Sequence, residues 1–352
     1  MNRKRLGIVF VVAFLAALAA AAHADAPAGP RLAYMRFSLE PFRFELITSA
    51  ANGTATRLVA GGGSRARPLP NPFSPPSWSP DGAQIVFRGL VGGFESRSSH
   101  ESLFVVAADG GSRREIPYTA GAAFPVFSPD GHTIAFARER ERTRQTRHGE
   151  RVVYESASVW LVDLGGGAPR RITPWRNHLR QIPSSFSPDG SILAVTREAG
   201  DKTPEAIGLS FDGSASTVIA RNASEPVFSP DGSRIALLRG PRRTVTEPDG
   251  PLSVRVNDLY TVNYGGGGLR RLTDTPRSVE LMPRWDPSGQ RLVYTRWSWG
   301  GPAAEEFGFT DFSPQVNADG SCRARTRAYP GAGAFGATWQ PGPGREAGPI
   351  AC

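Results

Sequence analysis

The sequence is poor in lysine, cysteine and histidine. Lysine accounts for only two of the 41 basic residues, so arginine carries almost all of a net charge of +9 at pH 7. The two cysteines form no C-x-x-C pair, the five histidines include no closely spaced pair, and no EF-hand loop occurs. A G-x-S-x-G elbow and a Walker-type glycine loop are missing as well. These absences argue against an α/β hydrolase and a P-loop protein, and we expect no cofactor.

Glycine and proline, in contrast, are abundant, with 40 and 31 residues. Both residues break helices, so they argue against long helices and against a coiled coil. Hydrophobic residues at 39% and aromatic residues at 9% argue against wholesale disorder. The composition therefore favours a globular protein that is rich in strands and loops.

The N-terminus has the pattern of a signal peptide. Charged residues 2–5 precede an apolar run over 6–22, and the small-x-small triplets that end at Ala24 and Ala26 are alternative cleavage sites. An uncleaved membrane anchor is the competing interpretation, because the run can just span a bilayer. We predict a signal peptide over 1–24, a single domain over 25–352, export to the periplasm or the exterior, and no transmembrane span after cleavage.

One phrase recurs along the rest of the chain. P-S-W-S-P-D-G-A-Q-I-V-F returns as P-V-F-S-P-D-G-H-T-I-A-F, S-S-F-S-P-D-G-S-I-L-A-V and P-V-F-S-P-D-G-S-R-I-A-L. A weaker copy, P-R-W-D-P-S-G-Q-R-L-V-Y, and a fragment, A-T-W-Q-P-G, follow. The copies recur at intervals of roughly 50 residues. One aromatic residue anchors each copy: Trp78, Phe127, Phe186, Phe228, Trp285 and Trp339.

Each repeat predicts four antiparallel strands. S-P-D-G is typical of a type I turn between a short first strand and a second strand with alternating apolar residues. A third strand, such as 205–210 or 258–263, ends at a glycine-rich hairpin turn that leads into a short fourth strand. Four such strands are typical of one blade of a β-propeller. We interpret the turn aspartates and the anchor aromatics as structural.

The two ends of the chain together supply one more set of strands. Residues 337–340 form a lone first strand, and 31–36, 43–48 and 54–60 provide the second, third and fourth. Joining the ends leaves no exposed edge strand. The predicted fold is all-β: a six-bladed β-propeller with four antiparallel strands per blade, whose last blade is closed by the N- and C-terminal segments.

The two cysteines, Cys322 and Cys352, are predicted to form a disulfide, because an exported protein folds in an oxidising compartment. The bond would close a loop of about 30 residues, for a stabilisation of roughly 3–4 kcal/mol. It would bracket the closing strand and secure the tail that completes the ring. Two free thiols are the alternative.

The S-P-D-G phrase with its following apolar strand resembles the repeat of the TolB family of six-bladed periplasmic propellers. The resemblance covers nearly the whole chain after the signal segment. It specifies the repeat more than the function, because such repeats occur in proteins of several roles. TolB proteins carry a separate domain before the propeller, whereas here the predicted propeller begins soon after the cleavage site. We therefore expect a TolB-like propeller without that N-terminal domain.

Arginine recurs at one repeat position just past the second strand: Arg36, Arg138, Arg197, Arg239 and Arg296. Connections from second to third strands share one face with those from fourth strands to the next blade, and we name it the Arg-rich loop face. Symmetry predicts a ring of guanidinium groups there, and long loops add more arginines. The candidate binding residues are Arg138, Arg140, Arg142, Arg144, Arg147, Arg176, Arg180, Arg197, Arg239, Arg277 and Arg296. A solvated, self-paired charge surface is the competing interpretation, because glutamates lie among these arginines.

Three histidines offer a second interpretation of the same face. His100, His148 and His178 fall on its loops in neighbouring blades, and some propeller enzymes gather metal ligands on such a face. They are weak candidates as ligands or bases, because loops tolerate any polar residue. The alternative function is therefore a lyase or hydrolase that acts on an anionic glycan.

The sequence favours a non-catalytic, exported propeller scaffold that binds a protein or an anionic envelope polymer on the Arg-rich loop face. The planar guanidinium fork suits such anionic partners. We expect no catalytic residue, no metal and a monomer. Nucleic acid is not an expected partner, because the protein is exported and its arginines are scattered. A purely structural secreted domain with no saturable partner is a third alternative.

Overall fold

The computed structural model describes residues 29, 31–39, 41–63, 68–92, 99–146, 149–200, 202–247, 250–276, 278–298, 314–325, 332–342, 345–347 and 349–352. All regular elements in these ranges are β-strands, which confirms the all-β prediction. None of the residues so described forms an apolar helix of the length needed to cross a membrane. The predicted signal peptide, 1–24, lies outside the described residues.

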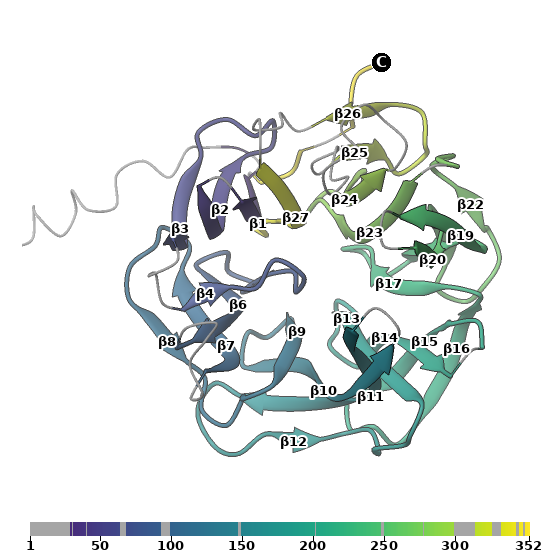
Figure 1. The fold of residues 1–352 in the computed structure, drawn as a ribbon. Helices are drawn as coiled ribbons and strands as arrows, with labels where there is room; N and C mark the ends of the chain where they lie inside the picture. The colour runs from purple at the N-terminus through teal and green to yellow at the C-terminus, as the bar shows by residue number, and fades with distance from the viewer. Residues whose placement is uncertain are drawn as a thin grey trace, which may run out of the picture.

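The described residues form antiparallel sheets that are arranged around a central axis (Figure 1). The first sheet formed wholly from one stretch of sequence has the order β4–β6–β7–β8, and β5 also pairs with β6. Its strands are β4 (Leu69–Pro70), β5 (Ser77–Trp78), β6 (Gln84–Val91), β7 (His100–Ala107) and β8 (Arg113–Glu115). The sheet therefore follows the order in which the repeat supplies its strands.

The next sheet contains two such units, which are joined by one parallel pair between Ala157 and Arg180. The first unit is β9 (Ala122–Phe127), β10 (Thr133–Thr146), β11 (Gly149–Asp163) and β12 (Arg170–Arg171). The second unit is β13 (Leu179–Phe186), β14 (Ile192–Ala199), β15 (Glu205–Ser210) and β16 (Ser216–Arg221). Apart from the one parallel pair, neighbouring strands within this sheet are antiparallel.

Two further four-stranded sheets continue the ring, and the last one joins the chain ends. One is β17 (Ser224–Phe228), β18 (Arg234–Arg239), β21 (Asp258–Asn263) and β22 (Arg270–Arg271). The other is β23 (Ser278–Trp285), β24 (Arg291–Ser298), β25 (Pro314–Asn317) and β26 (Arg323–Arg325). The joining sheet is β27 (Ala332–Trp339), β1 (Arg31–Leu39), β2 (Phe42–Ala50) and β3 (Arg57–Gly63). Pairing of β1 with β27 confirms that the N- and C-terminal segments share one sheet.

The hydrophobic core is divided among the interfaces between neighbouring sheets. Each anchor aromatic belongs to a different cluster of buried side chains. Trp78, for example, packs with Phe335 of the preceding sheet and with Phe87 of its own. At the other side of the joining sheet, Trp339 packs with Leu32 and with Val293 of β24. The aromatic at the end of each first strand therefore attaches its sheet to the preceding one.

The S-P-D-G turns have the predicted local role. In the first turn, Asp81 accepts hydrogen bonds from the Ser79 hydroxyl and from the Ala83 amide. Equivalent bonds to Asp231 from Ser229 and Ser233 lower the pKa of that carboxyl to about 2. The carboxylate therefore stabilises its own turn.

The same turns also touch one another around the ring. The glycine of each turn lies against the proline of the preceding one, as Gly131 does against Pro80 and Gly232 against Pro188. Gly82 lies against Pro341, which follows the last anchor aromatic, and its φ of 68° is one that a side chain would strain. The row of turns is therefore continuous across the junction of the two chain ends.

The long loops that we expected to add arginines to the Arg-rich loop face, 138–151 and 241–252, belong to β-hairpins in the structure. Strands β10 and β11 continue past the end of their sheet and pair as far as Thr146 with Gly149. Strands β19 (Arg242–Glu247) and β20 (Gly250–Arg255) form a separate two-stranded sheet between β18 and β21. The expectation of loops was wrong because alternating Thr, Val and Arg residues in these segments suit paired strands as well as they suit a charged loop.

The predicted disulfide is present between Cys322 and Cys352, with the Cα atoms 5.5 Å apart and a sequence separation of 30. The tail before Cys352 is also held by side chains of the preceding sheet. Asn317 accepts a hydrogen bond from the Ile350 amide at 2.6 Å, and Arg291 donates one to the Ala347 carbonyl at 3.1 Å. The tail therefore crosses back over β24 and β25.

Candidate functional site

A bulge in five first strands, β9, β13, β17, β23 and β27, shapes the channel along the central axis of the ring. The pairing of first with second strands shifts register near the third residue before the anchor aromatic. Phe124, Glu225 and Met282 occupy this position with φ between 51° and 55°, in the left-handed region that side chains rarely adopt. Gly336 is the equivalent residue in β27, and a Cβ atom there would come within 2.7 Å of Pro75. The bulges therefore converge near the axis.

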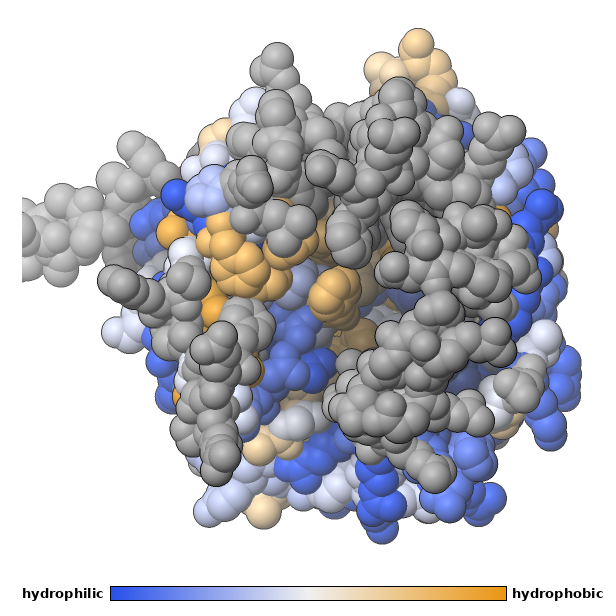
Figure 2. Space-filling model, in the orientation of Figure 1, coloured by the Kyte–Doolittle hydropathy of each residue, from blue (hydrophilic) through white to orange (hydrophobic). Residues whose placement is uncertain are grey.

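A cavity of about 340 Å³ opens at this level, on the side of the Arg-rich loop face. Four arginines and two glutamates are its charged lining residues: Arg180, Arg242, Arg255, Arg284, Glu198 and Glu225. Figure 2 shows the hollow near the centre of the ring, bordered on one side by hydrophobic atoms. We name this cavity the channel mouth. Its charged lining carries an excess of positive charge.

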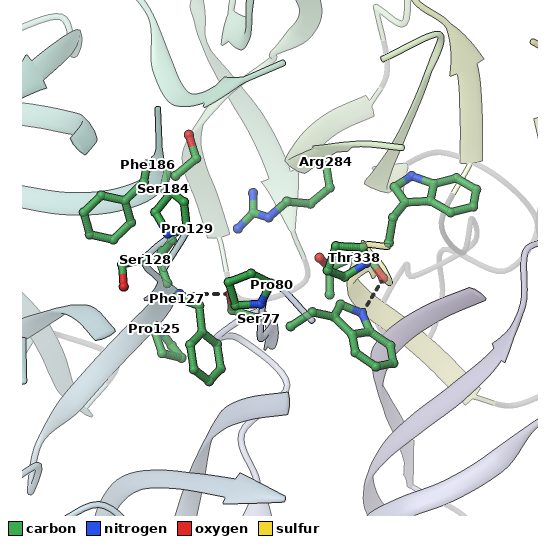
Figure 3. Close-up of a pocket in the computed structure, with 15 residues that line it drawn as sticks. Ser77, Pro80, Pro125, Phe127, Ser128, Pro129, Ser184, Phe186, Arg284 and Thr338 are labelled. Carbon is green, nitrogen blue, oxygen red and sulfur yellow. Dashed lines mark hydrogen bonds between the residues drawn. The ribbon is translucent and has the colours of Figure 1, made fainter. Parts of the chain in front are cut away.

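A second cavity of about 250 Å³ lies at the opposite end of the channel, between the S-P-D-G turns. It is lined by prolines of those turns, by anchor aromatics and by hydroxyl groups, among them Ser77, Ser184 and Thr338. Arg284 is its single charged lining residue within the described part of the chain. In Figure 3 the guanidinium of Arg284 extends into the space between Ser184 and Thr338. We name this cavity the inner pocket.

Glu225 and Arg284 are the charged residues deepest in the channel. Burial raises the pKa of Glu225 to about 7, and the positive charge of Arg284 partly opposes that change. Burial also lowers the pKa of Arg284, while Glu225 acts in the opposite direction. The Glu225 carboxylate accepts a hydrogen bond from the Met282 amide at 2.5 Å. Loss of hydration therefore favours the neutral form of both groups, and their mutual attraction opposes that change.

The recurrent arginines lie within the second strands, in β1, β10, β14, β18 and β24, and not just past them as predicted, because these strands extend further than expected. Neighbouring groups engage them. Arg36 binds Glu45 across β1 and β2 at 2.5 Å, and Arg197 binds Glu205 across β14 and β15 at 2.5 Å. Both acidic partners stand directly opposite their arginine in the strand register. Cross-strand pairs of this kind stabilise a sheet. The ring of guanidinium groups is thus partly neutralised by a matching set of carboxylates at the start of third strands.

Other candidate arginines lie on aromatic rings. Arg138 lies 4.4 Å from the ring of Trp160, and burial lowers its pKa. Arg140 is exposed and lies 4.2 Å from the ring of Trp175. Arg239 lies 5.7 Å from the Tyr260 ring. Stacking of this kind orients a guanidinium group while leaving its edge available to an anion.

The remaining predicted arginines are distributed unevenly. Arg180 reaches the channel mouth, where it binds Glu198 at 2.7 Å and Glu139 at 2.8 Å. Arg176 is exposed and Arg296 is half-buried in β24. Arg147, Arg277 and the side chains of Arg142 and Arg144 lie outside the described residues. Of the predicted binding arginines, Arg180 is therefore the one that lines a cavity in the described part of the chain.

The candidate histidines do not form a metal site in the described part of the chain. His100 lies in β7, with its Nε2 atom 3.5 Å from Glu115. His178 is exposed before β13, and His148 lies outside the described residues. Among residues that the structure describes, no group of three His, Cys, Asp or Glu side chains could hold a metal ion.

Sequence reasoning missed Arg242, Arg255 and Arg284 as a group, because they converge from separate strands. One signal was available. The residue before the anchor aromatic is neutral in every copy of the repeat except the one where Arg284 stands. A departure from the repeat at a channel-lining position is the feature that identifies this residue.

Comparison with known proteins gives TolB proteins as sequence relatives. No protein-family model matches the chain. The Tol-Pal system protein TolB of Francisella tularensis subsp. mediasiatica is 29% identical over 271 residues, which is 75% of this chain and 54% of that protein. TolB of Cereibacter sphaeroides is 28% identical over 185 residues, 45% of this chain and 41% of that protein. The chain thus matches about half the length of these curated relatives.

Solved structures share the architecture. TolB from Acinetobacter baumannii superimposes with a TM-score of 0.65 and 20% identity, covering 89% of this chain and 67% of that one. Kuenenia stuttgartiensis hydrazine synthase has a TM-score of 0.59 and 12% identity, with 93% and 48% covered. At these identities the similarity shows the fold alone. Together with the sequence relatives, it supports a TolB-like β-propeller.

Proposed function

We propose that the protein is a non-catalytic scaffold of the cell envelope that binds an acidic protein segment or an anionic envelope polymer at the channel mouth. The observation that carries this proposal is the convergence of Arg180, Arg242, Arg255 and Arg284 on one cavity with two glutamates. Clefts with an excess of one charge attract oppositely charged partners and increase their rate of association. The similarity to TolB proteins, which belong to the Tol-Pal system, supports an envelope role.

The proposal includes the architecture that frames this site. We infer six blades, with β9–β12 and β13–β16 counted separately and the sheet of both chain ends as the closing blade. We further propose export by a signal peptide over 1–24 and a monomeric propeller over 25–352. The other candidate arginines of the Arg-rich loop face would extend the binding surface outward from the mouth. No observation in the described residues favours the glycan lyase or hydrolase.

Salt-dependent binding of a fluorescent polyglutamate peptide tests the proposal. The mature protein should bind the peptide saturably, and affinity should fall as sodium chloride rises, because salt screens exposed charges. Replacing Arg180 and Arg242 together by glutamine should weaken binding about tenfold or more, since hydrogen bonds to charged groups are lost. Anisotropy titrations measure both effects.

The matched control is the double variant Arg170→Gln and Arg270→Gln. It removes the same charge from exposed residues that follow the turns between third and fourth strands, on the opposite face. It should retain most of the affinity. Equal losses in the two double variants would show a response to net charge alone and would reject the channel mouth. Binding of an anionic polysaccharide but not of polyglutamate would assign the envelope polymer as the partner class.

A further inference from the structure

The residues that immediately precede the anchor aromatics occupy equivalent positions around the ring. All of them are short and neutral except one. They are Ser77, Val126, Ser185, Val227, Arg284 and Thr338. Most of them line the inner pocket. Ser77 and Ser185 serve the architecture, because their hydroxyls accept hydrogen bonds from the Phe127 and Phe228 amides of the next sheets. Arg284 replaces a short neutral side chain by a long charged one.

Arg284 has few partners for its five N–H groups. Its Nη1 atom donates to the Pro283 carbonyl at 2.8 Å, which is its one hydrogen bond among the described residues. Its guanidinium extends into the inner pocket, where no acidic residue stands among the lining side chains that the structure describes (Figure 3). Burial lowers the pKa of Arg284, and its remaining N–H groups can donate to an acceptor in the pocket.

A second donor beside the same pocket also lacks an acceptor. In two other repeats the anchor indole donates to the carbonyl of the preceding sheet, from Trp78 to Thr338 at 3.1 Å and from Trp285 to Val227 at 3.0 Å. Trp339 is buried, with 4% of its surface exposed, yet its Nε1 atom has no hydrogen-bond partner among the residues that the structure describes. A buried donor without a protein partner can be satisfied by a bound water or anion.

We propose that the inner pocket binds a small oxyanion, of the phosphate or carboxylate class, with Arg284 as its main ligand. The guanidinium supplies a planar pair of donors that matches two oxygens of such an anion. Ser184, Thr338 and Trp339 line the same space, and no carboxylate stands among its lining residues in the described part of the chain. This site goes beyond the proposed function, because it lies at the turn end of the channel, although Arg284 lines the channel mouth as well.

Titration of the mature protein, labelled with ¹⁵N at its tryptophans, with inorganic phosphate tests the site. The seven tryptophans give a small set of indole signals in a ¹⁵N spectrum, and Trp339→Phe identifies that of Trp339. Phosphate at constant ionic strength should shift this signal saturably and raise Tm by a few degrees. Acetate in a parallel titration separates the two anion classes, and saturation by either one supports the site.

Arg284→Val, which copies the residue at Val126 and Val227, should weaken the response about tenfold or more. Arg284→Lys retains the positive charge and should keep a weaker but saturable response, which guards against loss of folding in the valine variant. The double variant Arg180→Gln, Arg242→Gln at the channel mouth should leave the response unchanged. An indole signal that does not shift with either anion, or that shifts equally in Arg284→Val, would overturn the proposal.

Discussion

Trp78 donates its indole N–H to the main-chain carbonyl of Thr338, which stands 260 residues further along the chain, at 3.1 Å. The same junction contains a hydrogen bond from the Gln340 side chain to the Gly82 carbonyl at 2.8 Å. Both bonds connect the C-terminal segment, at the end of β27 and just after it, to the sheet formed by β4 to β8. The ring is therefore closed by specific bonds as well as by strand pairing.

Trp78→Phe should lower the free energy of unfolding by about 1 kcal/mol beyond the loss of packing, because the Thr338 carbonyl loses its donor. Trp285→Phe removes the equivalent bond to Val227 and should cost a similar amount. Trp339→Phe removes no such bond to a described residue and should cost least. Urea unfolding of the three variants gives the comparison, and equal losses would contradict the role of the indole bonds.

Cys352→Ser should lower the free energy of unfolding by about 3–4 kcal/mol, since the disulfide closes a loop of 30 residues. Hydrogen bonds from Asn317 and Arg291 to the tail reduce the loss, because they hold it in the folded state without the covalent bond. Chemical denaturation with and without reductant measures the difference. A wild-type protein that is unaffected by reduction, with both thiols then shown to be alkylated, would contradict this estimate.

Glu280 gives stability a defined pH dependence. It is fully buried, and burial raises its pKa to about 7, although bonds from the Leu259 amide and from the Thr273 and Thr275 hydroxyls oppose the change. The negative charge of Asp258 adds to the increase. The folded protein thus holds a proton that the unfolded chain releases near pH 4.5. The contribution of Glu280 to the free energy of unfolding is complete below pH 4.5 and is lost as the pH rises through about 7.

The size of that loss is roughly 3 kcal/mol. Glu280→Gln should therefore reduce the slope of the unfolding free energy against pH between pH 5 and pH 7.5. The reduction should correspond to the release of about one proton on unfolding. Glu225 titrates in the same direction, so some decline should remain in the variant. Urea midpoints at several pH values test this, and identical slopes in the two proteins would refute it.

Removing a carboxylate from the Arg-rich loop face should strengthen polyanion binding. Glu205 accepts from Arg197 at 2.5 Å and from Arg221 at 2.6 Å, so both guanidinium groups are partly neutralised. Glu205→Gln should raise affinity for polyglutamate a few-fold at low salt. Asp109→Asn, at an exposed turn on the opposite face, is the matched control and should have little effect. A decrease in affinity for Glu205→Gln would contradict the attractive role of these arginines.

Much of the scaffold could be predicted because the repeat determines it locally. The predicted third strands 205–210 and 258–263 have the observed bounds, and the turn aspartates make the expected local bonds. The hairpin formed by β19 and β20 was not predicted, because charge and alternation in 242–255 fit a loop and a strand pair equally well.

The site depends on relations between repeats, which a linear pattern does not contain. The recurrence of arginine past the second strand was visible, but the cross-strand carboxylates that bind Arg36 and Arg197 depend on strand register. The first-strand bulge that points Glu225 and Met282 at the channel has no sequence signature, since Phe, Glu and Met all adopt it. Arg284 was visible as a departure from the repeat, but its place in the channel required the ring.

Site-specific photo-crosslinking in the native envelope tests the central claim, binding on the Arg-rich loop face, most directly. A benzophenone at Tyr118, an exposed residue of that face between β8 and β9, should form adducts with an envelope partner. The same group at Tyr264, an exposed residue at the turn between β21 and β22 on the opposite face, should form few. Adducts from Tyr118 that disappear in Arg180→Gln, Arg242→Gln are the predicted result. Adducts from Tyr264 alone, or adducts from Tyr118 that this variant leaves unchanged, would contradict the account.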